Sequence, residues 1–263
     1  MSSAVTVTAE VMGTVASITL ISAVRRDGDV GEAVAACIER LRDDERLFST
    51  YRDDSDVSRL RDGVLALDEA DPRLAEVAAR CRELRARSGG RFDADWRGWF
   101  DPTGYVKGWS VDAAATAFDG VLATGAIEAV GVNVGGDMRL RTAGGSDHVW
   151  RVGVAHPTRA GTLLATVEVV DAAVATSGTA ERGAHLIDPR TGAALTGPVS
   201  ATVVASDLAT ADAWATIAAV AGIDDLDVVG SAPVASGIVW QHGRTRRFAG
   251  GVEVSAFHDA LAG

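Results

Sequence analysis

Hydrophobic and polar positions alternate in the first part of the chain and then repeat with a helical period. Residues 5–22 alternate apolar with small or polar residues around Met12-Gly13-Thr14, which predicts a strand pair or one strand bent at the glycine. The helical period follows over residues 29–48, which predicts an amphipathic helix with these residues on one face: Val34, Cys37, Ile38 and Leu41.

Capping residues predict three further helices. A short helix follows the oxygen-rich run 53–56, extends through Leu60 and closes at Gly63. The next helix runs from Pro72 at its first turn to the Gly89-Gly90 stop. Residues 91–108 are dense in Gly, Asp and aromatics, which indicates a loop, and a helix should start near Gly108 and end at Asp119-Gly120.

The second half of the chain predicts mainly strands. Val130–Val134 is a short buried strand, and residues 138–141 should pair with 148–155 as a hairpin across Gly144-Gly145. A motif-rich loop is expected at 175–198 and a small-residue helix from Asp207 to Gly222, with strands at 163–170, 199–205, 233–240 and 247–254. With no linker or repeat, residues 1–263 are predicted to form a single compact α+β domain with two lobes around the loops at 91–108 and 175–198.

Composition and charge narrow the class of protein. Hydrophobic residues make up 47% of the 263 and charged residues 23%, which is a globular balance. The net charge of -11 argues against a nucleic-acid partner. The sequence contains no run of 18 apolar residues, so no membrane span is predicted. The N-terminus has no basic segment before an apolar stretch, so a cytoplasmic location is expected. The two cysteines, Cys37 and Cys81, are expected to be buried reduced thiols.

The rare residues of this chain mark its chemistry. Of the 25 basic residues only Lys107 is lysine, Asn133 is the single asparagine, and the two tyrosines are Tyr51 and Tyr105. All four lie in or beside Gly-rich loops rather than on amphipathic faces. Because Lys, Asn and Tyr are so rare in this chain, we expect the positions that carry them to have a chemical role.

Asp212 and Thr216 form the first candidate site, because residues four apart project from the same face of a helix. A carboxylate and a hydroxyl are hard oxygen ligands, which suit Mg²⁺ rather than zinc. The alternative is an exposed aspartate beside a threonine that bonds back to the preceding turn.

His185 and Asp188 form the second candidate, between Thr176-Ser177-Gly178 and a Gly-rich stretch that ends at Gly192. A histidine held by its neighbours is a proton acceptor with an unperturbed pKa of about 6.5. A structural histidine is the alternative.

Two Gly-rich segments complete the candidate chemistry. Asp101 to Gly108 brings Lys107 close to a helix start, where backbone amides and an ammonium favour phosphate. In Asn133 to Asp137, paired glycines allow a backbone to approach a ligand whose polar edges Asn133 and Asp137 would bind; a tight hairpin is the alternative. The dinucleotide pattern G-x-G-x-x-G after a strand is absent.

Taken in order, these motifs resemble those of the ApbE-type FAD:protein FMN transferases. The resemblance spans nearly the whole chain, and the matching segments are Met12-Gly13-Thr14, Phe48 to Tyr51 with Ser55 and Ser58, Gly90 to Asp93, Asp101 to Gly108 with Asp112, Asn133 to Asp137, Trp150 to Val154 with Pro157, Thr176 to Gly178, His185 to Gly192, and Asp212 with Thr216. It implies a T-fold-like domain with an FAD site between the Gly-rich loops.

The resemblance also implies an activity and a site. The enzyme would bind FAD with Mg²⁺ and transfer FMN to a Thr or Ser hydroxyl of an acceptor protein with a Ser/Thr-Gly-Ala-Ser/Thr motif, releasing AMP. It implies Mg²⁺ ligands at Asp212, Thr216 and the Gly104 carbonyl. His185 is the candidate proton acceptor, Asp188 its orienting partner, and Lys107 supplies positive charge. The implied FAD contacts are Met12, Tyr51, Arg91, Phe92, Asp93, Asp101, Lys107, Asn133, Asp137 and the Leu186 backbone.

Two features depart from the family pattern. Only Ala94 to Phe100 separate the Phe-Asp turn from Asp101, where many relatives carry dozens of residues, so part of the wall over the flavin is expected to be missing. Many relatives are also exported or lipid-anchored, and no signal for either is seen here. A hydrolase that forms FMN and AMP, and a non-catalytic FAD-binding protein, are the alternative functions.

Overall fold

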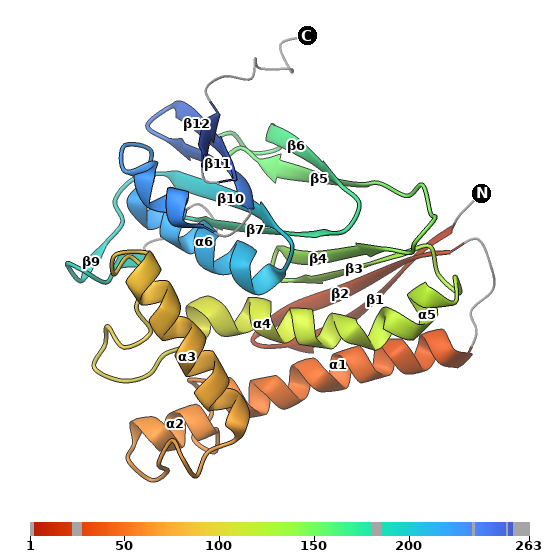
Figure 1. Ribbon diagram of the computed structural model, residues 1–263, viewed down its shortest axis with the longest axis horizontal. Coiled ribbons are helices and arrows are strands. Elements are labelled where there is room, and N and C mark those ends of the chain that lie inside the picture. Colours follow the sequence, from red (N-terminus) through yellow and green to blue (C-terminus); the bar gives the residue numbers. More distant parts are fainter. Residues whose placement is uncertain (1–2, 23–27, 180–185, 233–234, 251, 255–263) are drawn as a thin grey trace.

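Nine strands join in one antiparallel sheet, which forms the centre of the fold (Figure 1). The computed structural model describes residues 3–22, 28–179, 186–232, 235–250 and 252–254. The strand order is β1-β2-β3-β4-β7-β10-β11-β12-β13. Their bounds are β1 Ser3–Val11, β2 Thr14–Ser22, β3 Ala129–Val134, β4 Asp137–Thr142, β7 Ala172–Gly178, β10 Val199–Ala205, β11 Ala235–Gln241, β12 Arg244–Ala249 and β13 Val252–Val254.

Helices cover one face of this sheet (Figure 1). The long helix α1, Gly28–Phe48, packs against α4, Thr103–Ala115, which in turn crosses α6, Leu208–Ala221. Large side chains such as Trp214, Phe118 and Ile18 are fully buried between the helices and the sheet. The remaining helical elements are α2 Asp56–Arg61, α3 Pro72–Arg87, α5 Asp119–Ala123 and two 3-10 turns, Thr116–Phe118 and Leu226–Ser231.

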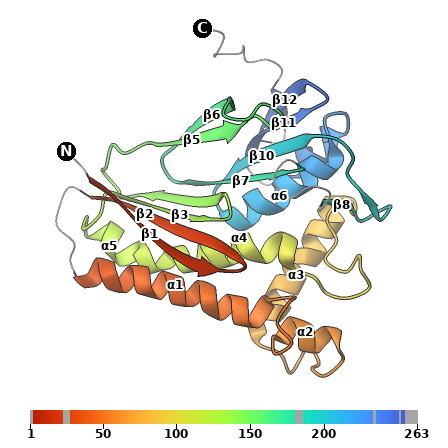
Figure 2. The ribbon, with the colours of Figure 1, turned by 180° about the vertical axis from the view of Figure 1, so that it is seen from behind.

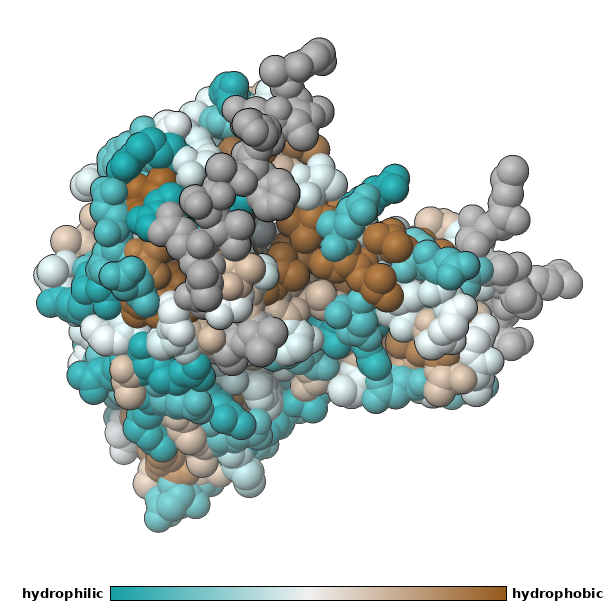
Figure 3. All heavy atoms as spheres, turned by 45° about the horizontal axis from the view of Figure 1, so that its top comes forward, coloured by the Kyte–Doolittle hydropathy of each residue, from teal (hydrophilic) through white to brown (hydrophobic). Residues whose placement is uncertain are grey.

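A separate two-stranded ribbon covers part of the other face. It consists of β5, Trp150–Ala155, and β6, Leu163–Val169, and it packs through Val152 against Leu140 and Val174 of the main sheet. Apolar side chains remain exposed near the ribbon, where Figure 3 shows a continuous hydrophobic surface; Val149, Leu163 and Val170 are among them. A smaller hairpin, β8 Ile187–Asp188 with β9 Ala193–Ala194, lies at the edge of the molecule.

The expected helices and strands are largely confirmed, with one wrong pairing. β4 pairs with β3 and β7, whereas the sequence predicted a hairpin between 138–141 and 148–155. The cause is the turn at Gly135-Gly136, whose φ angles of 61° and 98° close a two-residue connection between β3 and β4. The strand expected at 148–155 pairs with β6 instead.

The start of α4 is a second correction. This helix begins at Thr103, five residues before the predicted start at Gly108, so Lys107 lies on a helix rather than in a loop. Asp101 stabilises the earlier start, because its carboxylate accepts hydrogen bonds from the Thr103 amide at 3.2 Å and hydroxyl at 2.7 Å. The strand expected at 247–254 is divided at Gly250 into β12 and β13, and the loop expected from 175 begins within β7.

Both cysteines are buried free thiols, as the sequence predicted. Burial raises the pKa of each to about 12, so neither is a ready nucleophile. No helix in the described part of the chain is long and apolar enough to span a membrane.

Candidate active site

Lys107 is the centre of a buried ionic cluster where α4, β4 and α6 meet. Its Nζ atom donates a hydrogen bond to Asp137 of β4 and lies 3.5 Å from Oδ2 of Asp212 on α6. The two carboxylates are almost inaccessible to solvent, with side-chain exposures of 4% and 7%. The sequence predicted roles for all three residues, and the structure brings them together.

The Asp212 carboxylate is buried, and burial disfavours its charged form. Burial, with a smaller contribution from the nearby Asp137 carboxylate, raises its pKa to about 7, against the opposing effect of Lys107. Its Oδ2 atom accepts no hydrogen bond of good geometry from the described residues. A buried carboxylate oxygen without such a donor is costly unless a ligand satisfies it.

Thr216 lies one turn further along α6, as the spacing predicted. Its hydroxyl is 3.0 Å from the Ser177 hydroxyl at the end of β7. The preceding residue, Thr176, donates its amide to Asp137 at 3.0 Å, and its hydroxyl is 2.8 Å from that of Thr202. β7 therefore fixes both Asp137 and Thr216, a role that sequence spacing did not reveal because the contacts cross between elements.

The close crossing of α4 and α6 depends on a glycine and an aspartate. A Cβ atom at Gly108 would lie 2.5 Å from the Leu208 carbonyl oxygen, so only glycine permits this approach. The Asp112 carboxylate accepts the amides of Leu208 and Ala209 at 2.9 and 2.8 Å, which caps α6 from the neighbouring helix. Burial raises the pKa of Asp112 to about 6, although these two hydrogen bonds oppose the shift.

Gly104 lies in the first turn of α4. In an α-helix the amide of residue 108 faces the carbonyl of residue 104. The Gly108 amide also lowers the pKa of Asp212, so this line of α4 faces the carboxylate. Within the described ranges no three His, Cys, Asp or Glu side chains gather as a metal site, and the set of ligands expected at Asp212, Thr216 and the Gly104 carbonyl stays a prediction.

The loop from Gly90 to Asp101 packs beside the start of α4. The Phe92 ring is buried, and a Cβ atom at Gly104 would lie 3.0 Å from it. The Asp101 amide donates to the Ala94 carbonyl at 2.7 Å, which closes the short segment noted in the sequence. Asp93 pairs with Arg85 at 2.9 Å, and Arg91 pairs with Asp225.

Three predicted FAD contacts lie in or beside turns and bends of the chain. Met12 has a left-handed φ of 52° in the two-residue turn between β1 and β2. The Asn133 side chain accepts the Gly136 amide at 3.0 Å and so fixes the turn that leads into Asp137. Tyr51 is 93% exposed, just beyond α1, with its ring free to meet a planar ligand.

The candidate proton acceptor, His185, lies outside the described residues. Leu186 is buried, and its carbonyl accepts the Leu195 amide at 2.9 Å. The Asp188 carboxylate pairs with the Arg190 guanidinium at 2.8 Å, which lowers the pKa of Asp188. The structure thus gives Asp188 an arginine partner, and its predicted role toward His185 stays a prediction.

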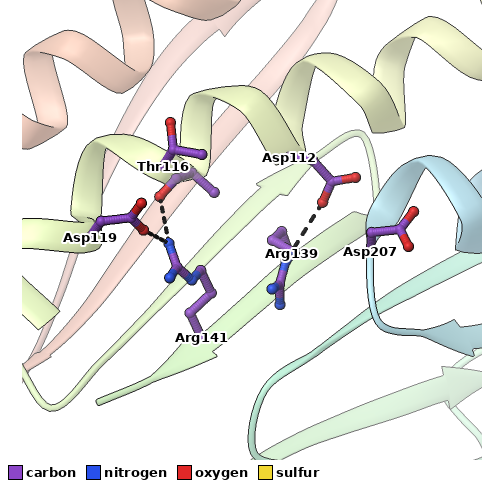
Figure 4. A pocket seen from close by; sticks show the side chains of 7 residues that line it. Asp112, Thr116, Asp119, Arg139, Arg141 and Asp207 are labelled. Atoms are coloured by element: carbon purple, nitrogen blue, oxygen red, sulfur yellow. Dashed lines mark hydrogen bonds and ion pairs between the residues drawn. The ribbon is translucent and has the colours of Figure 1, made fainter. Parts of the chain in front are cut away.

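A cavity of about 270 Å³ opens between α4, β4 and the start of α6 (Figure 4). No predicted site residue lines it. Its arginines are already neutralised, since Arg141 pairs with Asp119, and Arg139 pairs with Asp171 at 2.6 Å and lies 3.5 Å from Asp112. This cavity is therefore separate from the Lys107 cluster.

Comparison with known proteins decides the family. The model of the ApbE family matches residues 12–98 and 97–233. The chain belongs to the ApbE family. These matched ranges include Lys107, Asp137 and Asp212, so the buried cluster lies inside the part of the chain that ApbE proteins share.

Solved ApbE structures have the same fold. The flavin transferase ApbE from Vibrio cholerae superposes with a TM-score of 0.71 at 22% identity, covering 95% of this chain and 97% of its own. The apo flavinyl transferase ApbE from Pseudomonas stutzeri gives 0.70 at 20% identity, covering 94% of each chain. The ApbE protein from Thermotoga maritima gives 0.75 at 21%, covering 93% and 97%. Among curated proteins no match is found.

Proposed function

We propose that this protein is an FAD:protein FMN transferase. It moves FMN from FAD to a Thr or Ser hydroxyl of an acceptor protein through a phosphoester bond and releases AMP. The observation that carries the proposal is the buried Asp212 oxygen, which has no well-formed hydrogen bond and faces Lys107, in a chain of the ApbE family. FAD carries a pyrophosphate, the kind of anionic group that a lysine and a bound cation together neutralise.

The donor set fits Mg²⁺. Asp212 and Thr216, with the Gly104 carbonyl, would supply hard oxygen ligands, and the rest of the coordination shell is left to water and the FAD phosphates. Bound there, the ion would neutralise charge that develops on the phosphate oxygens. The buried oxygen of Asp212, which the protein gives only a 3.5 Å ion pair with Lys107, would gain a direct ligand bond.

The Lys107 ammonium could donate hydrogen bonds to a phosphate as well as to a carboxylate. Its ammonium is held by Asp137 while the Asp212 oxygen lies 3.5 Å away. With a cation held at Asp212, the lysine would keep Asp137 as its anchor, and its remaining donors would be available to the pyrophosphate. Asp137 is in turn fixed by the Thr176 amide, so the ammonium has a defined position.

The transfer step exchanges one bond for another. The acceptor hydroxyl oxygen attacks the FMN phosphorus, the bond from that phosphorus to the bridging oxygen breaks, and AMP leaves with the electron pair. The hydroxyl proton goes to a base, for which His185 is the candidate. Tyr51 would stack on the flavin ring, and the Gly90 to Asp101 loop would contact FAD beside it.

Intact mass of an acceptor protein tests the proposal. The chain is incubated with FAD, Mg²⁺ and an acceptor that carries a Ser-Gly-Ala-Thr segment, with Asp212→Asn as the matched variant. We expect AMP release together with an acceptor that gains the mass of an FMN phosphoester, and neither product with the variant. AMP and free FMN with an unmodified acceptor would assign a hydrolase instead, and bound but intact FAD would assign a flavin-binding protein.

A further inference from the structure

The outer strand of the main sheet is long and regular and is unpaired on one side. β1 pairs with β2 without a break from Ser3↔Ser22 to Val11↔Thr14, and among the described residues it has no second strand neighbour. Figure 2 shows β1 in red at the boundary of the sheet, with β2 between it and β3. Such an edge presents a row of unpaired backbone groups to another chain.

The register identifies which backbone groups are free. Val11 and Thr14 flank a two-residue turn and therefore form a hydrogen-bonded pair, so odd-numbered residues of β1 direct their amides and carbonyls to β2. The even-numbered residues direct theirs to the open side. Within the described chain, no backbone hydrogen bond outside the helices and strands involves residues 4–10. The free groups belong to Ala4, Thr6, Thr8 and Glu10.

The devices that usually protect a sheet edge are missing from β1. The strand contains no proline, lysine or bulge, and Glu10 is its single charged residue. The side chains of the even-numbered residues are exposed, whereas Val5, Val7 and Ala9 on the helix side are only partly buried. A neighbouring strand would complete the burial of this apolar row.

We propose that β1 pairs antiparallel with β1 of a second copy of this chain, about a two-fold axis at Val7. The register that overlaps all nine residues of the strand places Val7 opposite Val7 of the partner, and Thr6 opposite the partner's Thr8. Glu10 then lies opposite the partner's Ala4, so no like charges meet across the axis. All four free amides and carbonyls of each strand gain partners, because the even-numbered residues face one another.

This arrangement leaves each candidate active site independent. Met12 follows β1 directly, and the two copies of this residue would lie about 34 Å apart along the strands, from a rise of about 3.4 Å for each of ten residues. The dimer would extend the sheet across both chains, and each chain would keep its own Lys107 cluster. Breaking the edge should therefore change the mass of the particle and leave turnover unchanged.

Light scattering of variants with charged residues at positions 6 and 8 of β1 tests the interface and its register. Wild type should have twice the monomer mass at micromolar concentration. Thr6→Lys combined with Thr8→Lys should be monomeric, because the lysine at position 6 of each chain would face the lysine at position 8 of the other. Thr6→Lys combined with Thr8→Glu should remain dimeric, because the same positions then carry opposite charges. Circular dichroism of all three proteins separates loss of pairing from loss of folding.

A cross-link gives a second, independent readout. Val7→Cys should form an intermolecular disulfide on mild oxidation, because opposite residues of a non-hydrogen-bonded pair have Cα atoms about 4.5 Å apart. Thr6→Cys should not, since position 6 faces the partner's Thr8. A monomeric wild type, or a dimer that the double-lysine variant leaves intact, would overturn the proposal. Protection of the β1 amides from hydrogen exchange only when an acceptor protein is added would also overturn it, and would assign the edge to the acceptor.

Discussion

The junction of α4, β4 and α6 differs from the positions of Tyr51 and Asp188 in how far the side chains are exposed to solvent. In the junction, Lys107 and two nearly inaccessible carboxylates are held together away from water. Tyr51 is almost fully exposed, and the Asp188 side chain, 14% exposed, pairs with an Arg190 side chain that is 38% exposed. Buried ions are expensive to hold, whereas exposed pairs contribute little. We therefore expect substitutions in the junction to change turnover more than substitutions of Tyr51 or Asp188.

Loss of the Asp212 carboxylate should have the largest effect. Asp212→Ala removes the proposed metal ligand, and we expect Mg²⁺-dependent AMP release to fall by about a thousandfold or more. Initial rates across a Mg²⁺ titration measure this, with circular dichroism to confirm folding. Asp224→Ala, which removes an exposed aspartate paired with Arg244, is the control and should keep the wild-type rate. Undiminished turnover in Asp212→Ala would remove the junction from the chemistry.

Asp137 should rank second, because it acts through Lys107. Asp137→Asn keeps an oxygen for the Thr176 amide but removes the charge that anchors the lysine. Lys107 would then lose its fixed position beside the pyrophosphate, so kcat should fall about a hundredfold, and the lysine would also bind Asp212 more strongly and compete with the cation. The Mg²⁺ concentration for half-maximal rate should rise in parallel. A variant that lowers kcat with an unchanged Mg²⁺ requirement would contradict this competition.

The raised pKa of Asp212 predicts a pH-dependent metal requirement. Its pKa lies near 7 in the metal-free fold against an ordinary 3.8, so protons compete with Mg²⁺ below neutrality. The apparent Mg²⁺ affinity should fall about tenfold for each pH unit below 7. By the same linkage, the metal-free protein should lose stability as the pH rises from 3.8 to about 7, because over this range the unfolded chain has released the proton that the folded state still holds. Thermal melts at pH 5 and pH 8, with and without Mg²⁺, measure both effects, and melts that respond to neither variable would contradict them.

Tyr51 should affect binding rather than the chemical step. Tyr51→Ala removes the proposed stacking surface for the flavin, and KM for FAD should rise about tenfold with kcat little changed. Tyr51→Phe is the matched control, because it keeps the ring and loses only the hydroxyl. A fall in kcat with constant KM would contradict this prediction and would show that Tyr51 acts in the chemical step.

Asp188 should give the smallest effect. Its carboxylate is already paired with Arg190 close to the surface, so Asp188→Asn should change kcat by less than about threefold. Steady-state kinetics across pH 5 to 9 provide the test. A hundredfold loss with a shifted pH profile would instead show that Asp188 orients the catalytic base.

Much of the fold could be predicted from the sequence, because local periodicity and turn chemistry agree with the structure. The β1–β2 hairpin follows from alternation around Gly13, and α3 begins at Pro72, where the capping pattern placed it. The start of α4 was missed because glycines at 104 and 108 and the aromatics around them are typical of loops. At position 108 glycine is needed because the helix packs closely against the Leu208 backbone. No local sequence pattern reveals this contact.

The sequence predicted which residues belong to the candidate site, but it did not predict which of them contact one another. The rarity of lysine pointed to Lys107, and the spacing of Asp212 and Thr216 pointed to one helix face. The sequence did not show that Asp137 holds the lysine, because the two residues are 30 positions apart and meet only through the sheet. The bond between Ser177 and Thr216 was missed for the same reason.

A crystal structure with FAD and Mg²⁺ bound tests the central claim most directly. We expect Mg²⁺ within about 2.1 Å of the Asp212 carboxylate, the Thr216 hydroxyl and the Gly104 carbonyl, with water and pyrophosphate oxygens as its other ligands. Lys107 should keep its contact with Asp137 and donate a hydrogen bond to the pyrophosphate. An FAD molecule whose pyrophosphate contacts neither Lys107 nor a metal on Asp212 would contradict the account.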